Sequence, residues 1–302
     1  MSRAVIIGAG HVGSCAAFLL ALRDLFEEVV LVDKRPARAR AEADDMMAAL
    51  PRLGSETLVR GGDYADCAEA GIVILGAAAP VRLGQTRNDM FLKNSQIVSD
   101  AVGSCEAAGF GGLYLMVSNP VDLLVHFMVD RLDVPGERVV GTGTLLDSMR
   151  LEDCLRKRYA SSSVSALTLG EHGEGLVVDW TRTSVDAAPV PAPDREGLRR
   201  SAIEAAYEIM KGKGSTSYGI AVAVLTIVGR WLARDNRVMS LSVPAGGMYG
   251  IDGVSLALPV RFDEGGIPCV EELPLEHETL SALKNISVGM RESYRSLLDE
   301  VG

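Results

Sequence analysis

The sequence predicts an α/β protein whose first half is a doubly wound parallel sheet and whose second half is an α+β unit. Between residues 4 and 140, short apolar runs alternate with longer helical patterns, which is typical of a parallel sheet covered by helices on both faces. After residue 144, helical and strand patterns are grouped instead of alternating, which indicates an α+β arrangement. A length of 302 residues suits two units of this kind.

The strands expected in the first half are short apolar runs without polar alternation, at residues 4–7, 29–32, 72–75, 113–117 and 139–140. Helical patterns separate them at 14–25, 37–50, 90–108 and 120–132. The first strand, helix and second strand together form a βαβ unit of about 30 residues, the usual size of this motif.

The second half begins with a helical pattern at 145–159 and a strand pattern at 164–169. A surface loop with three prolines is expected at 186–194, followed by helices at 195–210 and 216–234, several β-type segments between 238 and 270, and a final helix from about 277 to 298. The pattern changes near Gly143, so we expect a boundary there and units of 1–143 and 144–302.

Composition and charge exclude several classes of function. The 30 Lys and Arg residues against 40 Asp and Glu give a net charge of −10 without a long basic run, which argues against nucleic acid or an anionic membrane as partner. No apolar run reaches the roughly 18 residues of a membrane span, and no secretory leader is visible at the start of the chain. The five cysteines form no CxxC pair, as expected of reduced thiols in the cytoplasm, and no pattern typical of metal ligands is found.

A glycine-rich turn follows the first predicted strand and opens the first helix. Its glycines are Gly8, Gly10 and Gly13, with His11 and Val12 between the last two, which gives G-x-G-x-x-G in a strand–turn–helix context. This spacing permits a tight turn, a close approach of backbone to a pyrophosphate and close helix–strand packing, which is the Rossmann fingerprint. Asp33 ends the second strand 20 residues after Gly13 and would accept hydrogen bonds from the adenosine ribose. We therefore expect NAD as cofactor rather than NADP, although Lys34 and Arg35 follow directly.

Several polar residues elsewhere could support acid–base chemistry on a bound substrate. Asp147 and Arg150 stand one helical turn apart on the same face of a predicted helix. His172 follows a predicted strand, and Asn119 lies at the carboxyl end of another, where ligands bind in open α/β sheets. Arg87 lies in the glycine-containing stretch 77–89, which we expect to act as a lid.

These motifs occur together and in one order, and the chain thereby resembles the L-lactate/malate dehydrogenase family, within which it is most similar to the L-2-hydroxyisocaproate dehydrogenases. Besides the glycine turn, the resemblance is carried by S-N-P-V-D at 118–122, G-T-G-T-L-L-D at 141–147, L-G-E-H-G at 169–173, G-K-G-S-T-S-Y-G at 212–219 and Y-G-I-D-G-V at 249–254. It implies an NAD-dependent 2-hydroxy-acid dehydrogenase that works as a homodimer or homotetramer.

The resemblance also implies the roles of individual residues. His172 matches the residue that exchanges a proton with the substrate oxygen, Asp147 the carboxylate that orients its imidazole, and Arg87 the residue that polarises the substrate carbonyl. An imidazolium supplies both a proton and charge stabilisation near neutral pH, which is what a ketone needs as it accepts a hydride. Arg150 matches the guanidinium that holds the substrate carboxylate through two parallel hydrogen bonds.

Other positions concern the choice of substrate. Asn119 matches a residue near the nicotinamide and the substrate, and Thr216 matches a pocket-wall position. Val81 occupies the position six residues before the loop arginine, where the family reads the substrate side chain, so an apolar side chain is expected. Arg82 is adjacent and leaves open a malate dehydrogenase or a reductase of another doubly charged 2-keto acid. A catalytically silent NAD-binding regulator is a further alternative, and its mark would be loss of His172, Arg150 or Arg87.

Overall fold

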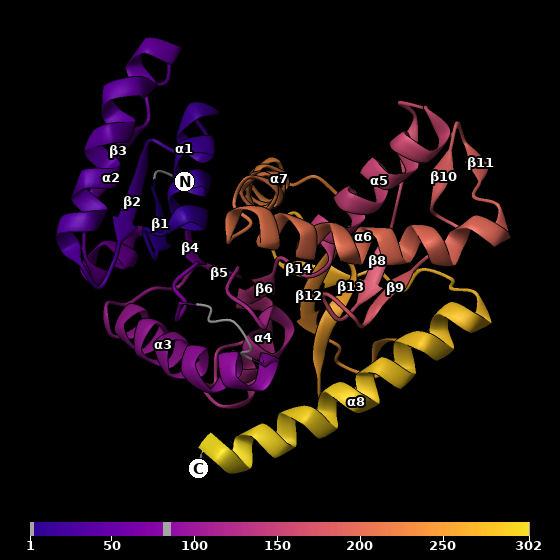
Figure 1. Cartoon of the computed structure of the whole chain (residues 1–302). Helices are drawn as coiled ribbons and strands as arrows, with labels where there is room; N and C mark the ends of the chain where they lie inside the picture. The colour runs from indigo at the N-terminus through magenta and orange to yellow at the C-terminus, as the bar shows by residue number, and fades with distance from the viewer. Residues whose placement is uncertain (1–2, 81–85, 302) are drawn as a thin grey trace.

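A computed structural model describes residues 3–80 and 86–301 of the chain. Six parallel strands form the first half of the sheet, in the order β3-β2-β1-β4-β5-β6 that is usual for a Rossmann fold (Figure 1). The strands are β1 (Arg3–Ile7), β2 (Glu28–Val32), β3 (Leu58–Gly61), β4 (Ile72–Leu75), β5 (Leu113–Met116) and β6 (Val139–Gly141). The helices are α1 (His11–Leu22), α2 (Pro36–Ala49), α3 (Arg87–Ala107) and α4 (Val121–Asp130), with short 3₁₀ helices at η1 (Leu50–Leu53), η2 (Tyr64–Glu69) and η3 (Gly136–Arg138).

The strands β1, β2, β4, β5 and β6 bury both of their faces, because helices cover the sheet on both sides. Residues such as Ile6 and Leu31 pack with α1, α2 and α7, whereas their neighbours Val5 and Val30 pack with α3 and α4. The apolar runs without polar alternation arise from this double burial. The predicted doubly wound parallel sheet is confirmed.

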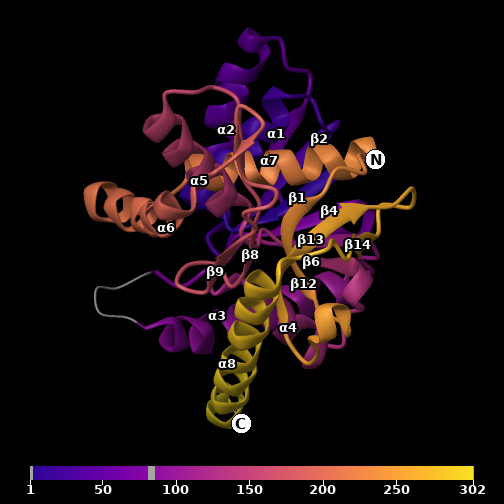
Figure 2. The same cartoon turned by 90° about the vertical axis from the view of Figure 1, so that its right-hand side faces the viewer.

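The second half combines helices with antiparallel strands, as the predicted α+β class requires. Its helices are α5 (Leu145–Tyr159), α6 (Ala192–Lys213), α7 (Tyr218–Ala233) and α8 (His277–Val301), with a 3₁₀ turn η4 (Met248–Gly250). Its strands are β7 (Val164–Ser165), β8 (Thr168–Gly170), β9 (Leu176–Val178), β10 (Ser184–Val185), β11 (Ala188–Pro189), β12 (Met239–Pro244), β13 (Ser255–Phe262) and β14 (Pro268–Val270). Figure 2 shows α8 as a long helix that extends from the strands of this half.

The two halves share one sheet. Gly141 of β6 pairs antiparallel with Ser242 of β12, and the order continues through β13, β8 and β9. Gly143, two residues beyond the end of β6, has a φ of +52°, and a Cβ at this position would lie 2.6 Å from the backbone nitrogen of Ser242. The turn that leads from β6 into α5 therefore requires glycine.

Two predictions in the second half are wrong in detail. The stretch 164–169 is not one strand: β7 pairs with β10 in a small separate sheet, and β8 joins the main sheet. The stretch 186–194 is not only loop, because it contains β11 and the first turn of α6. Pro191 is the residue before α6, so proline here accompanies the beginning of a helix.

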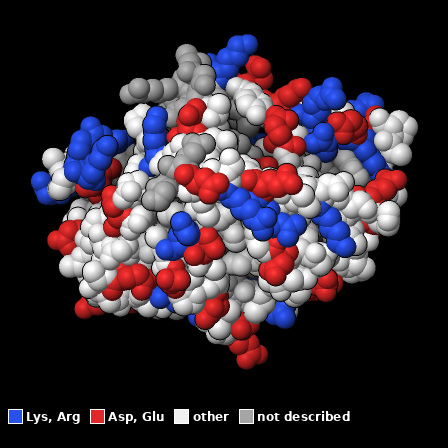
Figure 3. Space-filling model, turned by 90° about the horizontal axis from the view of Figure 1, so that it is seen from below, with Lys and Arg blue, Asp and Glu red and all other residues white. Residues whose placement is uncertain are grey.

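Lys and Arg side chains are interspersed with Asp and Glu side chains over the face seen in Figure 3. Although the net charge is −10, this face does not carry a large patch of a single charge sign. Within residues 3–80 and 86–301, no helix is long and apolar enough to cross a membrane.

Candidate active site

The glycine turn joins β1 to α1 at the carboxyl edge of the parallel sheet. Gly8 directly follows β1, and Gly10 precedes the first residue of α1, His11, which is exposed. A Cβ at Gly13 would overlap the carbonyl oxygen of Gly8, so only glycine allows this approach of helix to turn. At Gly10, by contrast, a Cβ would meet no atom within 4 Å.

This turn fits the pyrophosphate of a dinucleotide. No side chain caps the N-terminus of α1, so its first backbone N–H groups are available to an anion beside the open space at Gly10. Asp33 follows β2, and its two carboxylate oxygens accept hydrogen bonds from the backbone N–H of Ala9 (3.0 Å) and of Arg35 (2.9 Å). Because each carboxylate oxygen has a second lone pair, Asp33 can hold the glycine turn and still accept ribose hydroxyls.

His172, Asp147 and Arg150 form one hydrogen-bonded cluster at the opposite side of the site. Asp147 lies in the first turn of α5, is 2% exposed, and its Oδ2 lies 2.6 Å from Nδ1 of His172. Its Oδ1 accepts a hydrogen bond of 3.1 Å from Nη1 of Arg150, one turn further along α5. A buried carboxylate that accepts from the imidazole Nδ1 fixes the ring tautomer and orientation, and it stabilises the charged imidazole.

The backbone of His172 is held as well. His172 lies in the turn between β8 and β9, and its backbone N–H donates to Oδ2 of Asp122 at 3.0 Å. Asp122 is buried in the first turn of α4, just after the segment that contains Asn119. The imidazole is thus positioned through its ring by α5 and through its backbone by α4.

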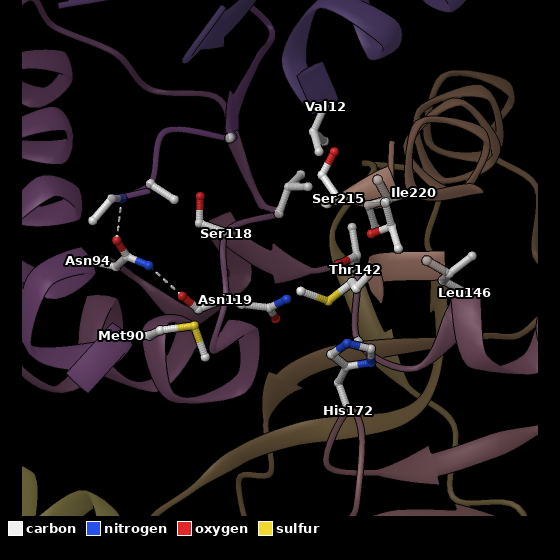
Figure 4. A pocket seen from close by; sticks show the side chains of 18 of the residues that line it. Val12, Met90, Asn94, Ser118, Asn119, Thr142, Leu146, His172, Ser215 and Ile220 are labelled. Atoms are coloured by element: carbon white, nitrogen blue, oxygen red, sulfur yellow. Dashed lines mark hydrogen bonds between the residues drawn. The ribbon is translucent and has the colours of Figure 1, made fainter. Parts of the chain in front are cut away.

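These residues surround a cavity of about 240 Å³ between the two halves of the chain. Val12, Asn119, Arg150, His172 and Thr216 all line it, so these five predicted residues converge on one space. The other predicted cofactor residues are not among its lining residues: Gly8, Gly10, His11, Gly13 and Asp33. Figure 4 shows His172 facing the cavity across from Asn119 and Val12. Seven of the other fourteen lining residues have apolar side chains: Ala78, Ala79, Met90, Val117, Leu146, Met210 and Ile220.

Three predicted residues belong to a part of the chain that the structure does not fully describe. Val81 and Arg82 lie outside the described residues, as do residues 83–85 of the expected lid at 77–89. Arg87 is the first residue of α3, where Thr86 and Asp89 cap the helix by reciprocal hydrogen bonds. The backbone of Arg87 therefore begins a capped helix close to Met90, which lines the cavity.

Sequence reasoning did not find several residues around the cavity. Asn94, Met90 and Ser118 line it, and Asp122 holds the backbone of His172. A signal for Asn94 was present, because it stands seven residues after Arg87 and hence two turns along the same face of α3. Asp122 lies within the S-N-P-V-D motif, but the motif alone indicates no contact with a histidine 50 residues away.

The fold and the site together define a nucleotide-dependent oxidoreductase, with an anion-binding glycine turn and an imidazole–carboxylate–guanidinium cluster at one cavity. Comparison with known proteins agrees with this class. Residues 2–141 match the lactate/malate dehydrogenase NAD binding domain, and residues 144–300 match the lactate/malate dehydrogenase alpha/beta C-terminal domain. The chain belongs to the lactate/malate dehydrogenase family.

Individual relatives cover almost the whole chain. An L-lactate dehydrogenase from Staphylococcus epidermidis is 33% identical in an alignment 306 residues long, and the alignment covers 98% of this chain and 97% of that protein. L-lactate dehydrogenase 2 of Staphylococcus aureus is 35% identical over 288 residues, covering 91% and 90%. The crystal structure of the minor L-lactate dehydrogenase from Enterococcus mundtii with bound ligands superposes with a TM-score of 0.92 at 30% identity and covers 98% of each chain. The protein is an NAD-dependent 2-hydroxy-acid dehydrogenase, as the sequence predicts.

Proposed function

We propose that the enzyme interconverts small 2-keto acids and L-2-hydroxy acids that carry one carboxylate and an apolar side chain. The observation that carries this proposal is the cluster of His172, Asp147 and Arg150 on the wall of an otherwise largely apolar cavity. In this proposal His172 is the proton donor, Asp147 orients it, and Arg150 binds the substrate carboxylate.

The residues of the chain account for each need of the reaction except the hydride, which NADH supplies when bound. With Nδ1 engaged by Asp147, the Nε2 atom of His172 gives its proton to the substrate oxygen and takes it back in the reverse direction. Arg150, already fixed through Asp147, presents a guanidinium that pairs with a carboxylate through two parallel bonds. We assign Arg87 to the substrate carbonyl from its sequence position, at the beginning of α3.

The lining of the cavity supports a substrate with a single carboxylate. Among the lining residues that the structure describes, Arg150 is the one with a permanent positive charge. Leu146, Ile220 and Met90 offer apolar surface, which suits a methyl or branched alkyl group better than a second carboxylate. Val81 supports the same preference from the sequence, and the relatives named above are L-lactate dehydrogenases. The substrate range therefore runs from pyruvate to 2-ketoisocaproate.

A panel of 2-keto acids tests this proposal. Initial rates of NADH oxidation are measured with pyruvate, 2-ketoisocaproate and oxaloacetate, and we expect the two singly charged acids to have the higher kcat/KM. A dominant rate on oxaloacetate would assign the site to a malate-type substrate. His172→Ala is expected to bind NADH with the parental Kd and to lose turnover, because the proton donor acts mainly in the transition state.

The remaining expectations concern organisation. We propose domains at 1–143 and 144–302, with the boundary in the turn before α5, and a cytoplasmic homodimer or homotetramer. The exposed side chains of α7, among them Tyr218 and Val222, support an assembly contact on this helix. Size-exclusion chromatography with light scattering measures the number of subunits.

A further inference from the structure

Asn94 connects three segments that surround the cavity. It lies in α3 and is 3% exposed. Its Oδ1 accepts the backbone N–H of Ala79 at 2.8 Å, and its Nδ2 donates to the backbone carbonyl of Asn119 at 2.6 Å. Figure 4 shows both bonds, with the Asn94 amide lying between the two loops.

The two partners of Asn94 require one acceptor and one donor from the side chain at this position. The N–H of Ala79 can only donate and the carbonyl of Asn119 can only accept, so the side chain must present an acceptor to one and a donor to the other. Aspartate in its charged form would place an oxygen against the carbonyl of Asn119, and an apolar residue would leave two buried backbone groups without partners. The uncharged amide of asparagine meets both requirements.

The bridge lies directly behind residues that face the substrate. Asn119 extends its side chain into the cavity toward His172 (Figure 4), while its backbone carbonyl is held by Asn94. Ser118 adds a parallel tie, since its hydroxyl donates to the carbonyl of Ala77 at 2.8 Å. The loop after β4 and the loop after β5 are thus fastened to each other and to α3, which begins at Arg87.

We propose that Asn94 is a positioning residue for the reduction of 2-keto acids. It acts through Asn119 and the Ala79 backbone, and this inference rests on the function proposed above. Displacements of about 1 Å in a site of this kind cost on the order of 100-fold in rate, so loss of the bridge lowers kcat/KM for the keto acid strongly.

The decisive variant is Asn94→Asp, because a proton restores the missing donor. At pH 8 the charged carboxylate faces the carbonyl of Asn119, and we expect kcat/KM with pyruvate to fall about 100-fold. Burial beside a carbonyl favours the protonated carboxyl group, whose O–H can donate to Asn119 as the amide does. The ratio of variant to parental kcat/KM is therefore expected to rise at least tenfold between pH 8 and pH 5.5. Asn94→Ala should lose activity to a similar extent but with a ratio that does not change with pH.

Gln96→Glu is the matched control, since it makes the same amide-to-carboxylate change at an exposed position of the same helix. It should keep kcat/KM within twofold of the parent at both pH values. A merely structural role of Asn94 predicts a lower melting temperature with no recovery at acid pH, and that result overturns the proposal. Parental kcat/KM in Asn94→Ala overturns it as well. Wild-type protein without turnover on any 2-keto acid refutes the proposed function, and this inference with it.

Discussion

Replacing Asp147 by Asn tests whether one carboxylate organises the whole acid–base cluster. In the structure Asp147 joins the imidazole of His172 at 2.6 Å to the guanidinium of Arg150 at 3.1 Å, and it is almost fully buried. Asparagine has nearly the same shape, so the change leaves the packing of α5 in place, but it removes the negative charge and replaces one of the two acceptor oxygens by a donor. The variant thus tests the charge of Asp147 together with its two accepted hydrogen bonds.

The size of the effect follows from the bond that is lost. A hydrogen bond to a charged group contributes about 1.5–3 kcal/mol, and the short bond within a buried cluster belongs at the upper end of that range. Since about 1.4 kcal/mol corresponds to a factor of ten, we expect kcat/KM for keto-acid reduction to fall roughly 100-fold. Because the charged imidazole loses its stabilising carboxylate, reduction should also cease at a lower pH than in the parent.

The assay is the initial rate of NADH oxidation from pH 6 to pH 9, together with the Kd for NADH and the melting temperature. Asp153→Asn is the control, because Asp153 is exposed on the same helix and pairs with Lys157 at the surface. It should leave kcat/KM unchanged. If Asp147→Asn retains kcat/KM within threefold of the parent, or if its pH profile coincides with that of the parent, Asp147 does not organise His172.

Two further predictions concern binding and stability. Gly13→Ala should lower the free energy of unfolding by about 1–3 kcal/mol, because its methyl group overlaps the carbonyl of Gly8. Gly10→Ala should fold normally, because its methyl group meets no protein atom, and should bind NADH more weakly, because the methyl group occupies the open space beside the turn. Urea denaturation measures the stability of both variants and fluorescence titration their Kd for NADH, and equal stabilities would contradict the overlap at Gly13. Burial lowers the pKa of His126 below its usual 6.5, although Asp130 and Asp252 oppose the shift. The folded protein thus resists protonation of His126, so the contribution of this residue to the free energy of unfolding is fully present above about pH 6.5 and declines as the pH falls further. His126→Gln should reduce this decline when the free energy of unfolding is measured in urea between pH 7.5 and pH 5. An unchanged dependence of that free energy on pH would exclude His126 as its source.

Local patterns in the sequence were sufficient for the central part of the fold. The strand at Ile72–Leu75 and the helix at Leu145–Tyr159 were predicted with the bounds that the structure shows, because each is a continuous run of one type with both ends marked. The edge strand β3 was not predicted. Only Val59 of its four residues is fully buried, so the strand has no apolar run by which it could be identified. Strands covered on both faces carry a strong signal and edge strands a weak one.

The site shows a similar division. The proximity of Asp147 and Arg150 could be predicted from the sequence because one helix turn separates them. The turn from Gly8 to Gly13 could be predicted because its residues are contiguous in the chain. Contacts between distant segments left no local trace. The contact of Asp122 with His172 and the position of Asn94 between two loops depend on how strands and helices assemble, which periodicity does not record.

The shared sheet fixes the position of the nucleotide-binding half relative to the half that carries His172. Because β6 is hydrogen-bonded to β12 and passes within a few residues into α5, the nucleotide-binding half and the half that carries the imidazole are built on one continuous slab. A hinge motion between the halves would have to break the pairing of β6 with β12. The separation between the glycine turn and His172 is thus fixed by the sheet, so we expect the cavity to open through segments at its rim and not through separation of the two halves.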